Sequence, residues 1–294
     1  MMNRPKEDFD ELVREIYVKV VPDAFWVKIS DFLWHYTSIE ALFGIIERKE
    51  IWLSDYRNLN DKAEIVSQIK TMIDIYNNST FRNRLIDEIM YSPDGEHLPN
   101  LGIDDERIFI FSLSQNQDDL NQWKGYANTK NGISIGFDVI DDDSILYKES
   151  DDVYVGKVIY EDEEKKEILF QYFSELKKLT DGYQEYYDEE IEEITIQVGL
   201  FLQICSVCFK DIKWKDENEV RIFAIDRNFT DIHYQIKNGC IVPYGVIPIK
   251  YETIASLLLL NRDNTEKQMI YEYFVSKNMK QVNIDFSDVD IRFK

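Results

Sequence analysis

The sequence reads Phe32-Leu33-Trp34-His35-Tyr36-Thr37-Ser38-Ile39-Glu40 where a strand is predicted to run directly into a capped helix. The aromatic run at its start is typical of a short buried strand. Thr37 and Glu40 match a capping box, in which two side chains bind main-chain N–H groups that the first helical turn leaves unpaired. Apolar residues then recur at helical spacing, at Ile39, Leu42, Phe43 and Ile46. A strand and a helix in direct succession therefore open the predicted core.

Short strands and amphipathic helices follow along the rest of the chain. Ile51-Trp52-Leu53 predicts a second strand, and Asn60-Asp61 can cap a helix whose apolar residues extend to Tyr76. Residues 91–106 are expected to be a loop, because Pro and Gly recur in them. Further strands are expected at 107–114, 133–137, 217–225, 240–249, 254–260 and 281–286, and further helices at 118–126, 161–179, 183–210 and 265–277.

This order of elements predicts an α+β fold in which mixed or antiparallel sheets are flanked by helices. The chain has no internal repeat and no linker rich in Pro, Gly and Ser. We therefore expect an N-terminal helical extension over residues 1–31 and a single α+β domain over residues 32–294. A helical insertion at about 161–210 interrupts that domain.

Composition limits the classes of protein to which the chain can belong. Of its 294 residues 44% are hydrophobic and 14% aromatic, which excludes wholesale disorder. The net charge of −22 excludes a uniformly basic surface that coats nucleic acid, although a small basic groove remains compatible with it. Three cysteines make no disulfide framework, no apolar signal region follows the N-terminus, and the apolar run 254–260 is too short to span a bilayer. We expect a cytoplasmic, soluble protein without membrane contact.

The three histidines differ in their surroundings. His97 and His233 lie in polar stretches, where an ordinary surface position explains them. His35 lies in the aromatic strand immediately before the capped helix, so its imidazole is expected near a helix N-terminus, where donors converge on a ligand. The alternative for His35 is a core histidine with one satisfied hydrogen bond.

The cysteine pair and the acidic clusters are better explained by structure than by metal binding. Cys205-x-x-Cys208 could contribute to a zinc site, but zinc needs about four ligands, and both cysteines lie on an apolar helical face. We expect them to be buried and free of metal. The clusters at 141–143 and 188–193 are expected to be solvated faces.

The segment 214–223 carries charge into a predicted strand. Alternation places Glu217, Glu219 and Arg221 on one face of it. Such a face is either a half-exposed edge strand with an ion-paired arginine or a carboxylate held at the mouth of a cleft by that arginine.

These pieces occur together in one order that resembles a bacterial domain-of-unknown-function family, number 2971, often met in phage-defence neighbourhoods. The resemblance covers about residues 32–290. It rests on His35-Tyr36-Thr37-Ser38, on Trp52-Leu53-Ser54 followed by Asn60-Asp61, on Phe111 to Ser114 followed by Trp123 and Tyr126, on Gly132 to Phe137, and on Trp214 to Arg221. The chain departs from the family pattern at Leu59 and Lys62, where that pattern has Phe and Pro.

The layout is also similar to that of ADP-ribosyltransferases, which use NAD as substrate. The resemblance implies that His35 hydrogen-bonds the adenosine ribose, Ser112 supports the pocket and Tyr126 stacks on nicotinamide. Glu219 then accepts from the 2′-hydroxyl of the nicotinamide ribose. Catalysis is thereby assigned to Glu219, Tyr126 and His35, and Tyr36, Thr37, Trp123 and Arg221 are expected to contribute to NAD binding. We further expect His35 and Glu219 on neighbouring strands of one cleft.

The resemblance implies an ADP-ribosyltransferase-like effector in anti-phage defence or toxin action. Its expected partners are NAD, an unidentified nucleic-acid or protein acceptor and a defence-system protein, and no metal is expected. If water replaces the acceptor, the enzyme is an NAD glycohydrolase. Two alternatives remain: a non-catalytic sensor or interaction module, and a Mg²⁺-dependent nuclease.

Overall fold

The structure is a computed structural model that describes residues 6–25, 32–59, 64–82, 84–90, 107–127, 131–138, 153–181, 188–225, 232–237 and 239–289. The chain forms two compact units, and each is described by itself. A helical unit takes residues 1–27, 59–107 and 156–212, and a sheet unit takes residues 28–58, 108–155 and 213–294. The predicted loop at 91–106, the cap at Asn60-Asp61 and His97 lie outside the described residues.

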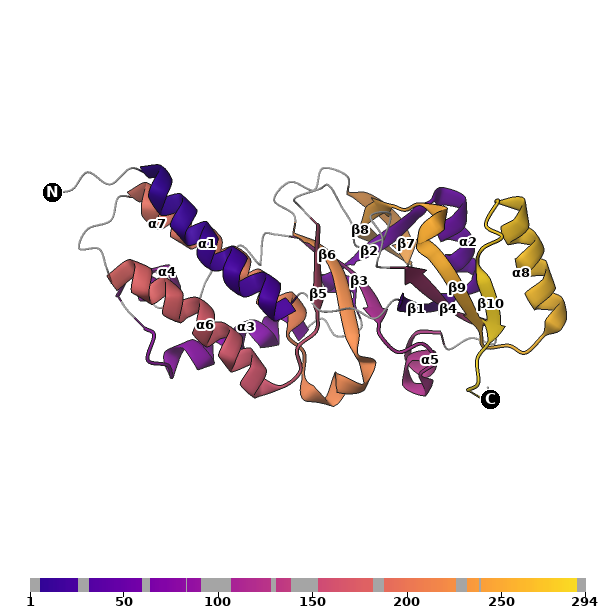
Figure 1. The fold of residues 1–294 in the computed structure, drawn as a ribbon, viewed down its shortest axis with the longest axis horizontal. Coiled ribbons are helices and arrows are strands. Elements are labelled where there is room, and N and C mark those ends of the chain that lie inside the picture. The colour runs from indigo at the N-terminus through magenta and orange to yellow at the C-terminus, as the bar shows by residue number, and fades with distance from the viewer. Residues whose placement is uncertain are drawn as a thin grey trace. The chain divides into compact units, whose positions relative to one another are not determined.

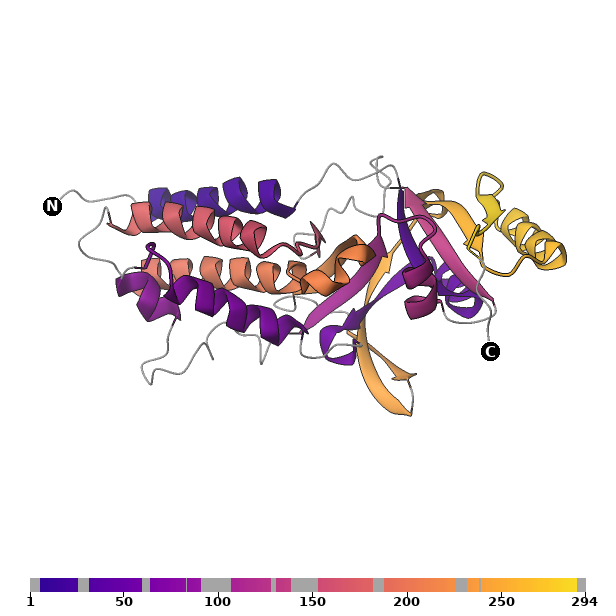
Figure 2. The same ribbon diagram turned by 90° about the horizontal axis from the view of Figure 1, so that it is seen from below.

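The helical unit contains the long amphipathic helices of the chain. They are α1 (Lys6–Phe25), α3 (Glu64–Asn77), α4 (Arg84–Met90), α6 (Asp162–Asp181) and α7 (Asp188–Cys208). Figure 2 shows α1, α3, α6 and α7 running alongside one another. Aromatic rings fill the space between them: Tyr172 and Phe201 stack with ring centroids 3.7 Å apart, and Tyr76 and Phe173 pack at 5.1 Å. The predicted insertion at 161–210 thus packs with helices from two other parts of the chain.

Helix α7 is the central apolar helix of this unit. Its segment Glu190–Cys208 is long and apolar enough to cross a membrane by length and composition, and 61% of it is buried within the protein, as in the core helix of a folded domain. Cys205 and Cys208 are completely buried, which confirms that expectation, and burial raises the pKa of the Cys205 thiol. The acidic start of α7 is only partly solvated, contrary to expectation, because Glu190 is buried.

The sheet unit carries the strands and three shorter helices. The strands are β1 (Phe32–Ser38), β2 (Glu50–Asp55), β3 (Ile108–Ser114), β4 (Gly132–Asp138), β5 (Val153–Lys157), β6 (Glu219–Ile225), β7 (His233–Lys237), β8 (Cys240–Pro248), β9 (Ile254–Leu259) and β10 (Asn283–Phe286). The helices are α2 (Ile39–Arg48), α5 (Leu120–Tyr126) and α8 (Asn264–Ser276). Short 3-10 turns occur at Tyr56–Asn58, Ile212–Glu217 and Tyr251–Thr253.

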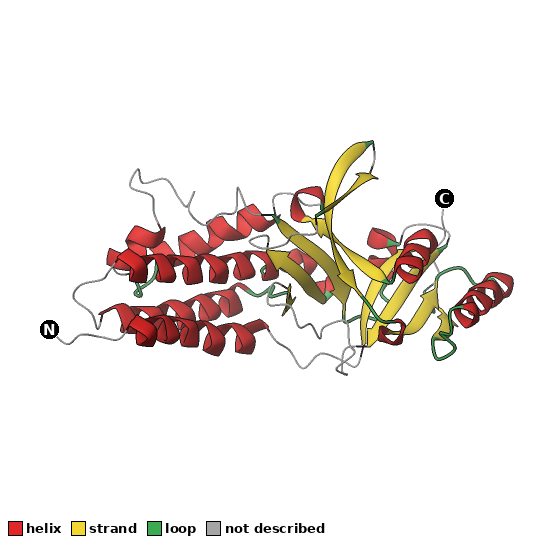
Figure 3. Cartoon of the chain, turned by 90° about the horizontal axis from the view of Figure 1, so that it is seen from above, coloured by secondary structure: helices red, strands yellow, loops and turns green. Residues whose placement is uncertain are grey.

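The described strands form one mostly antiparallel sheet with the order β10-β9-β4-β1-β3-β2-β8-β7, to which β6 is added beside β3 and β5 beside β6. Only the β9–β10 pair is parallel among the paired strands described. The predicted α+β class with mixed or antiparallel strands is therefore confirmed (Figures 1 and 3). Helices α2 and α8 contribute Leu42, Ile46, Ile270 and Phe274 to the main core on one side of the sheet. Helix α5 packs through Trp123 against Trp34 and Tyr36 of β1.

The sheet opens between β1 and β3. Strand β1 pairs along its whole length with β4, and β3 does the same with β6. The printed register between β1 and β3 joins them at Trp34 opposite Ser114. The two halves of the sheet therefore diverge on either side of this point, which leaves room for side chains between them.

The helix cap after β1 lies one residue later than the sequence predicts. Thr37 still belongs to the β1–β4 ladder, opposite Ile133, so it cannot act as the first residue outside the helix. Ser38 is the N-cap instead, and its Oγ accepts a hydrogen bond from the Ala41 N–H at 3.3 Å. The predicted strand-to-helix succession holds, but the Thr37–Glu40 capping box was wrong.

Compact units and segments of sequence divide this chain differently. The helix 64–77 was expected inside one domain that began at residue 32, whereas it packs in the same unit as the N-terminal helix. The chain passes from one unit to the other several times, so a division at residues 31 and 32 does not describe this grouping.

Candidate active site

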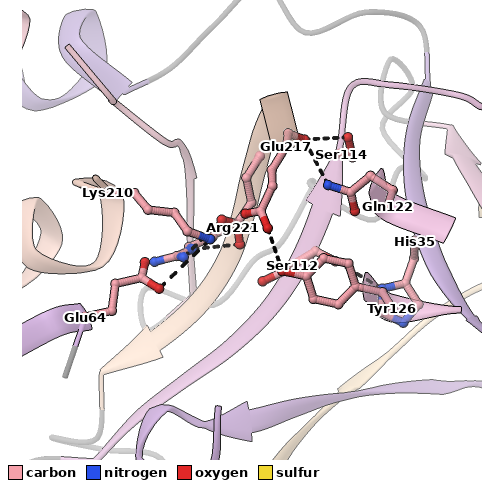
Figure 4. A network of polar contacts seen from close by, with 10 residues as sticks. His35, Glu64, Ser112, Ser114, Gln122, Tyr126, Lys210, Glu217 and Arg221 are labelled. Atoms are coloured by element: carbon pink, nitrogen blue, oxygen red, sulfur yellow. Dashed lines mark hydrogen bonds and ion pairs between the residues drawn. The ribbon is translucent and has the colours of Figure 1, made fainter. Parts of the chain in front are cut away.

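A small pocket lies where β1 diverges from β3. Its volume is about 60 Å³. Figure 4 shows several of the polar side chains around it. It is lined by Trp34, His35, Tyr36, Ser112, Leu113, Gln122, Tyr126, Glu217 and Glu219. Three strands, helix α5 and the turn before β6 thus contribute to one site.

His35 is a neutral imidazole with a defined tautomer. Its Nδ1 lies 3.0 Å from the Ser112 carbonyl oxygen, and its ring stacks on Phe111 with centroids 4.3 Å apart. Burial lowers the pKa of His35 to about 4, although the hydrogen bond to Ser112 opposes this shift. Because a carbonyl oxygen only accepts, Nδ1 carries the proton at neutral pH. Nε2 is therefore an acceptor suited to a hydroxyl or N–H group of a ligand.

Glu219 is held by a fixed ion pair with Arg221. The Arg221 Nε donates to Glu219 Oε1 at 2.9 Å, and Nη2 donates to Oε2 at 3.0 Å. Both side chains are buried, and alternation along β6 places them on the same face of the sheet. Two parallel charge-assisted bonds fix the carboxylate plane, and the guanidinium favours its ionised form. The arrangement presents a buried carboxylate of fixed orientation beside the pocket.

Glu217 provides a second carboxylate that the sequence analysis did not assign to the site. The Tyr126 hydroxyl donates to Glu217 Oε1 at 2.7 Å. Burial raises the pKa of Tyr126, and the neighbouring Glu217 carboxylate raises it further, so the phenol stays protonated at physiological pH. Tyr126 is nevertheless 45% exposed, and it forms the solvent-facing wall of the pocket.

A sharp turn brings Glu217 to the pocket. It ends the 3-10 turn Ile212–Glu217, and Asn218 then adopts a positive φ of 45° before β6 begins. Asn tolerates this left-handed conformation better than most residues. The Glu217 carbonyl oxygen accepts from Ser114 Oγ at 2.7 Å, which ties the turn to the end of β3.

Tyr36 positions helix α5. Its hydroxyl donates to the Asn116 carbonyl oxygen at 2.7 Å and accepts from the Asp119 N–H at 3.0 Å. Asp119 is in turn the N-cap of α5, and its side chain accepts from two N–H groups of the first turn. Gln122 and Tyr126, four residues apart on this helix, therefore face the same pocket.

Five of the residues predicted for the site line this pocket together: His35, Tyr36, Ser112, Tyr126 and Glu219. Strand β3 lies between β1 and β6, so His35 and Glu219 are not on neighbouring strands as expected, although they line the same pocket. Glu217 lies before β6 rather than in it.

The other predicted residues do not line the pocket. Arg221 contacts it through Glu219. Thr37 faces no part of the pocket lining, and Trp123 is completely buried with its indole N–H donating to Asp118 at 2.6 Å. Trp123 therefore supports α5 from behind.

Glu217 and Gln122 are the lining residues that sequence reasoning missed. The pattern around β6 did place Glu217 on a charged face with Glu219. Gln122 could have been found as the polar residue one helical turn before Tyr126. His233, expected at the surface, is exposed.

Two further features of the described residues bear on binding. They contain no group of three or more His, Cys, Asp or Glu side chains arranged to hold a metal ion. A larger groove, of about 760 Å³, lies in the helical unit between α3 and α6. It contains none of the predicted site residues, so volume alone does not indicate where chemistry takes place.

Comparison with known proteins adds one family. A family model described as "Protein of unknown function (DUF2971)" matches residues 122–222, about a third of the chain. No curated protein and no solved structure matches. Outside the matched stretch the wider resemblance over residues 32–290 stays a prediction. From Gln122 to Ile222, the stretch that includes Tyr126, Glu217 and Glu219, the chain is similar to this family of unknown function.

Proposed function

We propose that the protein is an NAD-dependent ADP-ribosyltransferase-like enzyme that acts as a defence or toxin effector on a nucleic-acid or protein acceptor in the cytoplasm. The observation that carries the proposal is the joint lining of one pocket by His35, Tyr126 and Glu219. A neutral acceptor, a phenol ring and a fixed carboxylate come from three separate parts of the chain. These are the groups that such a site needs.

The chemistry requires one well-placed negative charge. In this reaction the bond between ribose C1′ and the nicotinamide nitrogen breaks, the electron pair leaves with nicotinamide, and an acceptor or water bonds C1′ while losing a proton. Glu219 faces the positive charge that develops on the ribose, and its orientation is already fixed by Arg221. A preorganised charge of this kind costs no reorganisation during the reaction.

His35 and Tyr126 supply binding groups on either side of this charge. His35 Nε2 can accept a hydrogen bond from a ribose hydroxyl because Nδ1 is engaged by Ser112. Tyr126 offers a ring face for nicotinamide. Glu217 holds its hydroxyl group.

The residues fit NAD better than the volume does. About 60 Å³ holds roughly two water molecules at ~30 Å³ each, far less than a dinucleotide occupies. Tyr126 is the exposed part of the wall, so its rotation away from Glu217 is the movement that would admit the nicotinamide end. The rest of the dinucleotide would then lie outside the cavity described.

The same geometry favours one rival. Glu219 is buried and already bonded twice by Arg221, and the pocket is small. A non-catalytic sensor or interaction module would keep such an ion pair for stability alone. The nuclease alternative has no specific observation in its favour.

Turnover of labelled NAD by the purified full chain, with and without cell lysate, separates these functions. We expect nicotinamide release in the wild type, label transfer when the acceptor is present, and a 10²- to 10³-fold lower rate in Glu219→Gln, with NAD affinity less affected. Glu252→Gln, an exposed residue of the same unit, is the matched control and should keep the wild-type rate. Absence of NAD consumption by folded wild-type protein with lysate, or an unchanged rate in folded Glu219→Gln, would overturn the proposal.

A further inference from the structure

The hairpin of β7 and β8 presents an unusual apolar surface. Strand β7 ends the strand order of the sheet, so one of its edges faces away from β8. Ile236 and Ile241 lie directly opposite each other and are 79% and 76% exposed. Tyr234, on the same face of the hairpin, is 59% exposed. Figures 2 and 3 show this hairpin standing out from the rest of the sheet.

Charge is distributed unevenly around this surface. The whole chain has 56 acidic residues among 294, yet residues 232–248 contain none. Natural proteins usually protect an edge strand with charges, Pro or a covering segment, because an unprotected apolar edge pairs with other strands. Here Lys237 and His233 lie at the two ends of β7, and the residues between them are uncharged.

Hydrogen-bond alternation determines which main-chain groups face the open edge. Tyr234 is opposite Pro243, which has no N–H group, so this pair is of the type that exchanges no ladder bonds. Two residues later, Ile236 belongs to the same type. Its N–H and carbonyl groups therefore point away from β8, toward the edge.

We propose that β7 pairs in antiparallel fashion with β7 of a second copy of this chain, about a two-fold axis at Gln235. In this register Ile236 exchanges main-chain hydrogen bonds with Tyr234 of the second copy, and the two side chains form an aromatic–aliphatic cross-strand pair on the apolar face. The two Gln235 side chains meet on the other face, and His233 lies opposite Lys237 of the second copy.

A second copy fits this edge better than an unrelated partner for two reasons. The sequence of β7 is complementary to itself in this register, as an isologous interface requires. The hairpin is also the part of a chain of charge −22 where two copies can approach without facing carboxylates. Repulsion between the remaining surfaces extends about 8 Å at physiological ionic strength, so association should strengthen with added salt.

Sedimentation of the full chain over a range of concentrations tests the proposal. The contact is small, so we expect a reversible dimer with a dissociation constant on the order of 100 μM, tighter at higher salt. Ile236→Lys should abolish the dimer, and so should Ile236→Pro, which removes the outward N–H group. Met269→Lys, at a 64% exposed position on α8, is the matched control and should keep it. A monomer at every concentration, or a dimer unaffected in folded Ile236→Lys, would overturn the proposal.

Cys240 allows the register itself to be measured. It is the exposed cysteine of the three, and Cys205 and Cys208 are buried, so a thiol spin label modifies this one position in the native chain. Cys240 pairs with Lys237, which places the two Cys240 Cα atoms of the dimer about 20 Å apart, across three strand spacings and along four residues. A label-to-label distance near this value supports the register. A dimer with a clearly longer distance would exclude it.

Discussion

At the scale of single residues, the site depends on how two side chains are held rather than on which residues are present. His35 binds the Ser112 carbonyl group, and Glu219 binds Arg221. The sequence predicted both residues as polar positions in apolar strands, and it placed Arg221 beside Glu219 by alternation. It could not predict the His35 tautomer, because the partner, Ser112, lies 77 residues away along the chain. Nor could it reveal that Trp123 is enclosed, since burial depends on the packing of distant elements.

The protonation of His35 predicts a specific dependence of stability on pH. Its folded-state pKa of about 4 lies below the ordinary value of 6.5, so the unfolded chain binds more protons between these two values. The contribution of His35 is therefore fully present above pH 6.5 and is lost as the pH falls toward 4. It amounts to about 2–3 kcal/mol. In His35→Gln, which can still donate to Ser112, this part of the pH dependence should be absent.

Denaturant unfolding of wild type and variant at pH 7.5 and pH 4.5 measures this difference, and comparing the two proteins cancels the titration of the many carboxylates. His233→Gln, at an exposed position, is the control. Equal loss of stability on acidification in the wild type and in His35→Gln would show that His35 is not the group responsible.

At the scale of elements, sequence patterns located strands and helices better than their ends. The succession of β1 and α2 was predicted, but the cap lies at Ser38 because β1 remains paired with β4 as far as that residue. Glu217 was expected inside β6, and the left-handed conformation of Asn218 excludes it. Ends depend on a few hydrogen bonds with distant partners, whereas apolar periodicity extends over a whole element.

Helix α5 offers a prediction about such distant hydrogen bonds. Tyr36→Phe removes the hydroxyl that links the Asn116 carbonyl to the Asp119 N–H, and leaves the ring packed on Trp123. We expect the free energy of unfolding to fall by about 1–3 kcal/mol, since partly buried groups lose their partner. Amide hydrogen exchange should become faster in α5 while that of β4 stays slow. Unchanged exchange in α5 would mean that its cap and its apolar contacts position it without Tyr36.

The helical unit gives a prediction about packing. Phe201 of α7 is completely buried and stacks on Tyr172, whereas Phe170 of α6 is 53% exposed. Phe201→Ala should therefore cost about 3–5 kcal/mol of stability, because it leaves a cavity in addition to the lost burial. Phe170→Ala is the matched control, and we expect it to cost much less. Similar losses in the two variants would contradict the position of α7 as the core helix of this unit.

At the scale of the whole molecule, grouping of elements is the feature that sequence order conveyed least. The helical unit is assembled from three separated segments, 1–27, 59–107 and 156–212. Each segment shows a clear helical period, so helix type was predictable. Which helices pack together depends on contacts between segments more than a hundred residues apart, and a single sequence without such information favours divisions along the chain.

The net charge of −22 predicts how the stability of the whole chain responds to salt. Acidic residues outnumber basic ones by 56 to 34, so most surface carboxylates have more like charges than opposite charges around them. This self-repulsion disfavours the compact state. Salt shortens the Debye length from about 30 Å at 0.01 M to about 8 Å at 0.15 M, which screens the repulsion between separate surface regions. Exposed ion pairs such as Lys166–Glu163 are weakened too, but each contributes at most about 1 kcal/mol. The melting temperature should therefore rise when NaCl increases from 0.01 to 0.15 M. Measurement at a concentration low enough to keep the chain monomeric, with Ile236→Lys in parallel, separates this effect from self-association. A melting temperature that falls with salt in both proteins would mean that attractive ion pairs, rather than net repulsion, dominate the electrostatics of this chain.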